Sequence, residues 1–250
     1  MLQSEIREWL HETDPKRLDT LWAEADRVRA AHVGDAVHLR GLIEISNHCA
    51  RRCAYCGINA ENRHVSRYRM TREEILDSAR RAASFGYGTI VMQAGEDFSI
   101  SAEWLAEIVR AIRAETDLAI TLSMGERPDD ELRLWRDAGA DRYLLRFETS
   151  DPDLFARIHP PLPGSSRDRF AILRSLRELG FEVGSGIMVG IPGQTWNTLV
   201  NDISLFHTLD LDMIGIGPWI PHPDTVLARE RAAWAASAEE QVPNTEDMLY

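Results

Sequence analysis

The sequence has few cysteines, no long apolar run and no excess of basic residues. Its 250 residues include 3 Cys, and 40 Asp and Glu outnumber 28 Lys and Arg, for a formal net charge of −12. Because a nucleic-acid surface needs a basic face, this charge argues against a nucleic-acid partner. No apolar run approaches the roughly 18 residues that cross a bilayer, and the polar amino terminus does not resemble a signal peptide. We therefore expect a cytoplasmic protein without a membrane partner.

The three cysteines are clustered. Cys49, Cys53 and Cys56 follow one another closely, and an odd, clustered set without a secretory signal does not indicate disulfides. Three thiolates on one loop can bind three irons of a 4Fe–4S cluster, whereas ordinary electron-transfer clusters use four. The fourth iron would keep the open coordination position that a metal needs to act on a substrate. A zinc site with His48 as a further ligand, and incidental thiols, are the simpler alternatives.

Short apolar runs alternate with amphipathic stretches along the chain. Several of the helical stretches end at a glycine, which is a common helix stop. Strand, helix and strand at this spacing predict βαβ units and a parallel sheet. The expected strands cover residues 37–46, 89–93, 118–123, 142–147, 182–189 and 213–216, and the expected helices cover 72–85, 102–116, 129–137, 167–179 and 196–208.

The two ends of the chain complete this organisation. Residues 1–35 are expected to form an amino-terminal helical extension, with Asp14 as an N-cap and Pro15 at the first helical position. Residues 36–250 are expected to form a TIM-type (β/α) barrel, although only six βα units are visible instead of eight. A polar helical stretch follows over 228–240, and Asn244 resembles the N-cap of a further helix. A natural six-stranded partial barrel and a truncated barrel both fit, and we favour truncation, with the last two strands missing.

The cysteine motif, directly after the first expected strand and with Tyr55 before the third cysteine, resembles that of the radical S-adenosylmethionine (SAM) superfamily. Within it, the wider sequence resembles the HydE-type maturases of (FeFe) hydrogenases, which are relatives of biotin synthase and methylornithine synthase. The stretches that carry the resemblance are 67–70, 93–97, 121–126, 139–146, 184–190, 192–195, 212–218 and 220–225.

The resemblance implies an enzyme with a 4Fe–4S cluster that reductively cleaves SAM to a 5′-deoxyadenosyl radical, in assembly of the hydrogenase H-cluster. No catalytic residue beyond the cluster and SAM is implied. The implied partners are a small-molecule or iron-complex substrate, an electron donor such as ferredoxin or flavodoxin, and other hydrogenase maturases. Two alternatives stay open: a radical SAM enzyme of small-molecule biosynthesis, and a non-catalytic iron–sulfur or metal carrier.

The resemblance also implies roles for individual residues. The cysteines would bind the cluster, while Gly95 and Glu96 would contact the SAM amino group, Glu148 the ribose and Arg169 the carboxylate. The simpler readings are a strand-end glycine with a helix-capping acid, a rim salt bridge and a solvated helix charge, and Arg167 and Arg174 compete with Arg169. The full set of expected SAM contacts is Tyr55, Gln93, Gly95, Glu96, Glu148, Arg169, Met188, Met213, Ile216, Gly217 and Pro218.

Further residues are expected to lie near the adenine, near the substrate or on the cysteine loop. Met188 and residues 216–218 would lie along the adenine, although core packing explains Met188 equally well. Thr121, Ser123 and Phe147 would line the substrate side of the cavity. HydE-type sequences carry histidine in place of Phe147 and often serine in place of Ala94. Arg51 and Arg52, between the cysteines, would help a reductant to dock or tune the cluster potential, and a solvated loop is the simpler view.

Overall fold

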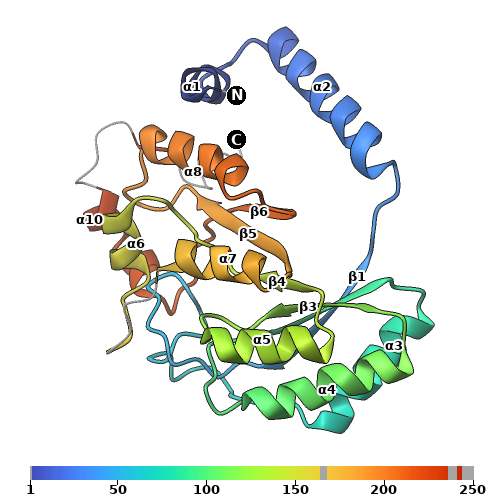
Figure 1. Cartoon of the computed structure of the whole chain (residues 1–250). Coiled ribbons are helices and arrows are strands. Elements are labelled where there is room, and N and C mark those ends of the chain that lie inside the picture. Colours follow the sequence, from blue (N-terminus) through green and yellow to red (C-terminus); the bar gives the residue numbers. More distant parts are fainter. Residues whose placement is uncertain (1, 164–167, 236–240, 244–250) are drawn as a thin grey trace.

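The structure is a computed structural model that describes residues 2–163, 168–235 and 241–243. Six parallel strands form one curved sheet in which chain neighbours are also sheet neighbours, from β1 to β6 (Figure 1). The strands are β1 (Arg40–Ser46), β2 (Thr89–Ala94), β3 (Ala119–Ser123), β4 (Arg142–Leu144), β5 (Glu182–Val189) and β6 (Met213–Pro218).

Helices connect the strands, and local sequence signals set their ends. The hydroxyl of Thr71 accepts a hydrogen bond from the backbone N–H of Glu74, whose carboxylate accepts from Thr71 in return. Gly139 ends another helix in the left-handed conformation. The helices are α1 (Gln3–Leu10), α2 (Pro15–Val33), α3 (Arg72–Ser84), α4 (Ala102–Glu115), α5 (Asp129–Ala138), α6 (Pro152–Ile158), α7 (Arg169–Glu178), α8 (Trp196–Thr208), α9 (Val226–Arg229) and α10 (Arg231–Ala235).

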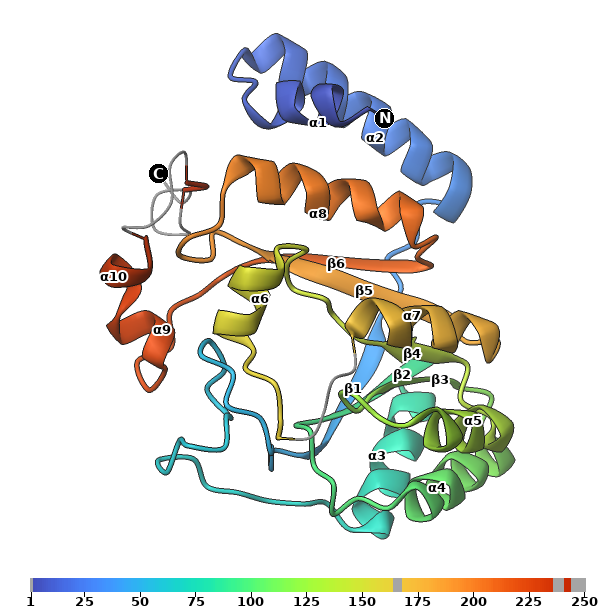
Figure 2. The same ribbon diagram turned by 60° about the vertical axis from the view of Figure 1, so that its left-hand side comes forward.

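The main core lies between the sheet and the helices that cover its outer face, among them α3, α4, α5 and α7 (Figure 2). Ile90 and Ile120 of the sheet and Trp135 of α5 are fully buried there. Burial of such side chains contributes on the order of 2 kcal/mol each, so this layer holds the strands in place. The strands in turn present their carboxyl ends to the long loop that follows β1.

The predicted fold class is confirmed, because six parallel strands stand in barrel order with helices outside. Within the described residues, the outer edges of β1 and β6 pair with no further strand, so the sheet is open. No helix among the described residues has both the length and the apolar character that spanning a membrane requires.

Several predicted boundaries are wrong. The first strand begins at Arg40, because residues 37–39 are exposed and meet no neighbouring strand. The fourth strand ends at Leu144, since it pairs with β3 only through Thr121 and Leu122. The predicted helix over 228–240 is resolved into α9 and α10 as far as residue 235. Residues 236–240 and Asn244 lie outside the described residues, as does Arg167.

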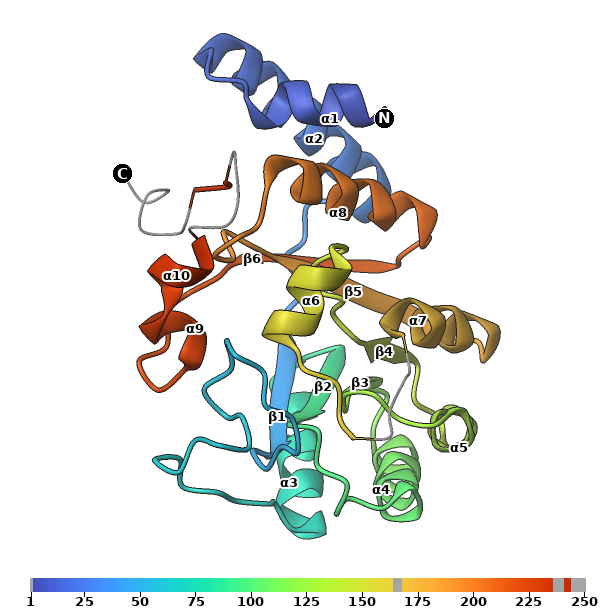
Figure 3. The same cartoon turned by 90° about the vertical axis from the view of Figure 1, so that its left-hand side faces the viewer.

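The amino-terminal segment forms two helices, because Pro15 begins a new helix after the Asp14 N-cap, whose side chain accepts from the N–H of Lys16. Helix α1 packs on α8, where the His11 and Trp196 ring centroids are 4.5 Å apart. Helix α2 buries none of its residues and lies apart from the sheet (Figures 1 and 3). The expected domain boundary after residue 35 stays a prediction.

Candidate active site at the carboxyl ends of the strands

The three cysteines lie on the loop that connects β1 to α3, beyond the carboxyl end of β1. Arg67 holds this loop in shape by donating to the backbone carbonyls of Asn47, Ile58 and Asn59 at 2.5–2.8 Å. The loop is also bonded to distant parts of the chain. Its Ala54 N–H donates to the carbonyl of Ile158 at the end of α6, and the Ala54 carbonyl accepts from α9.

The thiols of Cys49, Cys53 and Cys56 are free and largely enclosed. Burial raises the pKa of all three, and that of Cys53 to about 12, with the neighbouring thiols adding to the shift. Thiols in such surroundings ionise readily only when a cation compensates the charge. Among the described residues, no three His, Cys, Asp or Glu side chains converge on a single metal ion. A cubane cluster would take each thiolate on a different iron.

Gly95 follows β2 and lies directly against the cysteine loop. A Cβ at this position would stand 2.2 Å from the carbonyl oxygen of His48 and 2.9 Å from the Cβ of Cys49. Any side chain would therefore push the loop away. The adjacent Glu96 N–H lies 3.4 Å from the Cys49 sulfur. Gly95 thus allows the close approach of the cysteine loop, and its contact with SAM stays a prediction.

A buried network of charges lies behind the cysteines. Arg51 is 4% exposed and forms ion pairs with Glu96 and, at 2.6 Å, with Glu126. The solvated-loop interpretation is therefore wrong for Arg51, because acids from the loops after β2 and β3 bind its guanidinium. It holds for Arg52, whose side chain is 70% exposed. Arg169 extends the network, since its Nε donates to Glu126 at 2.9 Å.

Glu126 is the centre of this network. Burial disfavours its charged form, but hydrogen bonding and charge from His159, Arg169 and Arg51 prevail and lower its pKa to about 2. Burial, reinforced by Arg169 and Arg51, lowers the pKa of His159 to about 4. The ring of His159 lies 2.9 Å from Cys53, from Nδ1 to Sγ, and so joins the network to the cysteines.

Glu148 lies beyond the end of β4 and has a left-handed backbone, with φ of 63°. A non-glycine residue in this conformation is strained, and such strain gathers at functional sites. Its N–H donates to Gly186 and its carbonyl accepts from Met188, which fixes the residue against β5. Burial raises the pKa of the Glu148 carboxyl, while Arg146, Arg169 and the hydroxyl of Tyr55 act in the opposite direction. Tyr55 from the cysteine loop and Glu148 are therefore brought together.

The remaining expected SAM contacts, except Met213, lie toward the carboxyl ends of the strands. Met188 is buried beside Ala54 of the cysteine loop and Trp219. Gln93 donates to Glu44 at 3.0 Å, and Gly217 and Pro218 lie at the carboxyl end of β6. Ile216 is 59% exposed.

Met213 is the exception among the expected SAM contacts, because it begins β6 and so lies at the amino ends of the strands. There it borders a cavity with Arg40 and Thr89, the first residues of β1 and β2. The structure does not bring it to the cysteines. A short apolar run does not tell which end of a strand faces a ligand, which is why the sequence misplaced this residue.

The expected substrate residues also differ in position. Thr121 is fully buried on β3, and its hydroxyl has no hydrogen-bond partner among the described residues. Ser123 is half-buried and lies beside Gln93 in register. Phe147 packs in the main core against Phe170 and Phe206, at ring distances of 5.2 and 5.9 Å. Its side chain therefore faces the helices instead of the substrate side, contrary to expectation.

Sequence reasoning missed Glu126 and His159. The signal for Glu126 was an acid directly after a strand end, at Gly125-Glu126, which is where barrels place functional groups. The signal for His159 was a histidine before two prolines. Arg174, an alternative to Arg169, is exposed on α7.

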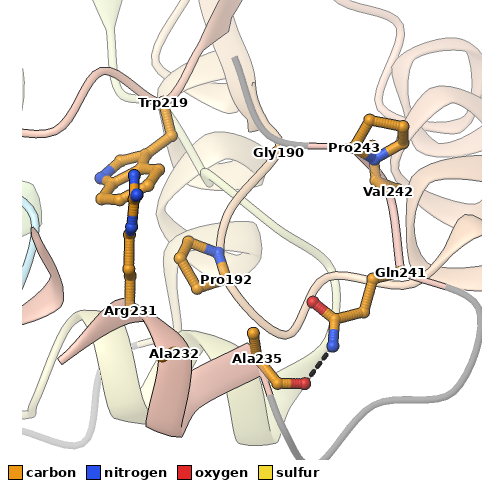
Figure 4. Close-up of a pocket in the computed structure, with 9 residues that line it drawn as sticks. All are labelled: Gly190, Pro192, Trp219, Arg231, Ala232, Ala235, Gln241, Val242 and Pro243. Carbon is orange, nitrogen blue, oxygen red and sulfur yellow. Dashed lines mark hydrogen bonds between the residues drawn. The ribbon is translucent and has the colours of Figure 1, made fainter. Parts of the chain in front are cut away.

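A separate cavity of about 470 Å³ lies beside the β5–α8 connection (Figure 4). Trp219 after β6, Arg231 and Ala235 of α10, and Gln241 border it, and Gln241 donates to the carbonyl of Ala235. None of the expected site residues lines this cavity.

The fold, the cysteine loop and the acids and arginines around it define a barrel-type α/β protein with three free cysteines at the carboxyl ends of its strands. The sequence pattern of the Radical SAM superfamily matches residues 43–206, and the chain belongs to this superfamily. Its relatives include the [FeFe] hydrogenase maturase subunit HydE of Thermotoga maritima, with 46% identity over 90% of this chain and 64% of that protein.

Two further similarities, one to a sequence and one to a solved structure, have lower identity. The 3-methylornithine synthase of Methanosarcina acetivorans is 27% identical over 90% of this chain and 64% of its own length. The crystal structure of methylornithine synthase (PylB) matches with a TM-score of 0.83 and 27% identity, over 91% of this chain and 67% of that one. The chain thus spans just under two thirds of the length of the curated relatives.

Superfamily members use a 4Fe–4S cluster and SAM, and the residues present fit both. Three enclosed thiols on one loop need a compensating cation, which a cluster would supply. The unpartnered hydroxyl of Thr121 lies within the sheet that carries the site. The strained Glu148 is an anion of the kind that ribose hydroxyls bind, whereas the guanidinium of Arg169 is bonded to Glu126, His159 and the carbonyl of Arg146.

Proposed function

We propose that this chain acts as a radical SAM enzyme in assembly of the (FeFe) hydrogenase H-cluster. The observation that carries the proposal is the set of three free cysteines on one loop at the carboxyl edge, with Glu148 and Arg169 nearby. The 46% identity to HydE supports the hydrogenase assignment. When bound, the cluster supplies the electron that cleaves SAM to methionine and a 5′-deoxyadenosyl radical.

The residues of the chain would bind and orient the cofactors. Cys49, Cys53 and Cys56 would hold the cluster and leave one of its irons open for SAM. Arg169 is bonded to Glu126, His159 and the carbonyl of Arg146, so it would meet the SAM carboxylate by exchanging one of these contacts. Glu148 would accept hydrogen bonds from the ribose. Glu96 is occupied by Arg51 and by the N–H of Glu126, so its backbone is better placed than its carboxylate to contact SAM.

The substrate and partners belong to the same proposal. We infer a small-molecule or iron-complex substrate, an electron donor such as ferredoxin or flavodoxin, and cooperation with other hydrogenase maturases in the cytoplasm. The partly enclosed site and its buried charges support a small polar substrate rather than a macromolecule.

The test is anaerobic reconstitution with iron and sulfide, followed by assay of 5′-deoxyadenosine from SAM and dithionite. We expect a 4Fe–4S electron paramagnetic resonance signal that changes on addition of SAM, and formation of the nucleoside. A tetrahedral zinc site, or a cluster whose signal ignores SAM, would contradict the proposal. A cluster that binds SAM without forming product would favour a non-catalytic carrier.

A radical SAM enzyme of small-molecule biosynthesis is the second candidate, supported by the similarity to methylornithine synthase. The two functions separate in a strain whose own HydE gene has been deleted. Restored hydrogenase activity supports the maturase, with Cys53→Ala as the inactive control. Cleavage of SAM without restored hydrogenase activity would favour the second candidate.

A further inference from the structure

The end of α6 is fastened to the cysteine loop. Helix α6 ends at Ile158, whose carbonyl accepts a hydrogen bond of 2.8 Å from the N–H of Ala54, directly after Cys53. Pro160 follows His159 and excludes a helical backbone there. His159 accordingly has φ of −134° and ψ of 70°. The proline thus ends the helix where the histidine side chain can reach the loop.

The ring of His159 lies between Cys53 and the charged network. Its Nδ1 is 2.9 Å from the Cys53 sulfur, and its Nε2 is 3.0 Å from Nη2 of Arg169. The ring centroids of Phe155 and His159 lie 5.0 Å apart, and His159 is 4% exposed. Both nitrogens therefore face protein groups, and the orientation of the ring is fixed.

The chemistry of the sulfur decides the direction of this hydrogen bond. A thiolate bound to iron carries no proton and can only accept, so Nδ1 must carry the hydrogen. In the neutral ring Nε2 is then an acceptor, and Arg169, which has donors only, lies in position to donate to it. Glu126 holds Arg169 in turn at 2.9 Å. Nε2 also lies 3.3 Å from Oε1 of Glu126, to which it can donate only in the opposite tautomer or in the protonated ring. With Cys53 bound to iron, the opposite tautomer would place two acceptors, Nδ1 and the thiolate, 2.9 Å apart. The remaining states of the ring, neutral with the hydrogen on Nδ1 or protonated, both donate from Nδ1 to the sulfur.

We propose that His159 is a positioning residue whose Nδ1–H donates to the Cys53 sulfur and raises the reduction potential of the cluster. This inference rests on the proposed function, because it needs the cluster. Hydrogen bonds to cluster sulfurs are among the factors that set the potential. A donor stabilises the sulfur more when the cluster has gained an electron, so loss of the donor makes reduction harder.

Three substitutions separate the hydrogen bond from packing. In His159→Asn the side-chain amide can stand where Nδ1 stands and keep an N–H near the sulfur. In His159→Gln the amide lies near the Nε2 position, so it can reach Arg169 but not donate to Cys53. His159→Leu keeps bulk and removes both nitrogens. The asparagine and glutamine variants are thus matched in polarity and differ in which contact they restore.

The measurement is the midpoint potential of the rebuilt cluster without SAM. Electron paramagnetic resonance monitors the cluster during a reductive titration. We expect the leucine and glutamine variants to shift to more negative potential by a common amount, and the asparagine variant to stay near wild type. A tenfold change in the one-electron equilibrium corresponds to about 59 mV, which such a titration resolves. Equal potentials in all four proteins, or equal shifts in all three variants, would overturn the proposal.

Cluster content gives a second readout. Loss of iron in the leucine and glutamine variants but not in the asparagine variant, at unchanged circular dichroism, also supports the hydrogen bond. Loss in all three variants indicates a packing role and contradicts it. Failure of the proposed function is distinguishable, because it would show in the wild type as a missing cluster or absent SAM cleavage.

Discussion

Charged side chains are buried at the carboxyl ends of the strands, here called the carboxyl edge, and exposed at their amino ends, the amino edge. At the carboxyl edge Arg51, Glu96, Glu126 and Arg169 are all nearly buried and form one network. At the amino edge the pair formed by Arg142 and Glu182 remains in contact with solvent. Buried ions cost several kcal/mol to desolvate, so a fold keeps them where they serve a purpose beyond stability. This difference indicates that the carboxyl edge is the functional edge, as in other barrels.

The largest expected effect lies with the cysteines. Cys56→Ala leaves two sulfur ligands on the loop, so we expect complete loss of the reconstituted cluster signal and of 5′-deoxyadenosine formation. Iron content and electron paramagnetic resonance check this outcome. Arg52→Ala is the matched control in the same loop, because its side chain is exposed and should leave cluster assembly intact. A cluster that survives in Cys56→Ala would show that another group binds the iron.

Removing the central acid of the network comes next. Glu126→Ala removes one ion-pair partner of Arg169 and one of Arg51, so both buried guanidinium groups lose compensating charge. Breaking a buried ion pair on one side costs about 3–5 kcal/mol, and we expect a loss of this size in the free energy of unfolding. Urea denaturation of the iron-free, reduced protein measures it. A loss below about 1 kcal/mol would mean that water reaches the network and the burial argument fails.

The contribution of Asp202 of α8 to stability is expected to depend on pH, which tests burial at the carboxyl edge. It accepts hydrogen bonds from the Ser150 N–H and from Gln194, which hold the loops after β4 and β5. Burial raises its pKa from 3.8 to about 6, although both hydrogen bonds oppose the shift. The folded protein therefore binds more protons than the unfolded chain between about pH 4 and 6. The contribution of Asp202 to stability should fall by roughly 3 kcal/mol as pH rises through that window.

Asp202→Asn is the control for this prediction, because it removes the titrating group. The informative quantity is the difference in unfolding free energy between wild type and variant from pH 4 to 7, which cancels other carboxyl groups. We expect the wild type to lose stability relative to the variant as pH rises to about 6, and a constant difference above it. A difference that stays flat throughout would show that Asp202 titrates normally.

The sequence predicted the parallel sheet and the cysteine loop because both depend on local patterns, the strand–helix alternation and the spacing of Cys49, Cys53 and Cys56. It missed the network because its members meet only in the fold: Glu126 lies 43 residues from Arg169, and His159 106 residues from Cys53. The same limit explains the misplacement of Phe147. Phe147 follows the end of β4, where no strand alternation exists to tell which side chains face the helices.

The smallest expected effect lies at the amino edge. Glu182→Ala removes the partner of Arg142, but Glu182 is 53% exposed, so water screens the pair and replaces much of the lost interaction. We expect a loss of at most about 1 kcal/mol in the same urea experiment, several times less than for Glu126→Ala. A double variant should show the two losses adding, since the sites share no partner. If Glu182→Ala instead destabilised the protein as much as Glu126→Ala, the two edges would not differ in how they hold charge, and burial could not be used to locate the functional end of the sheet.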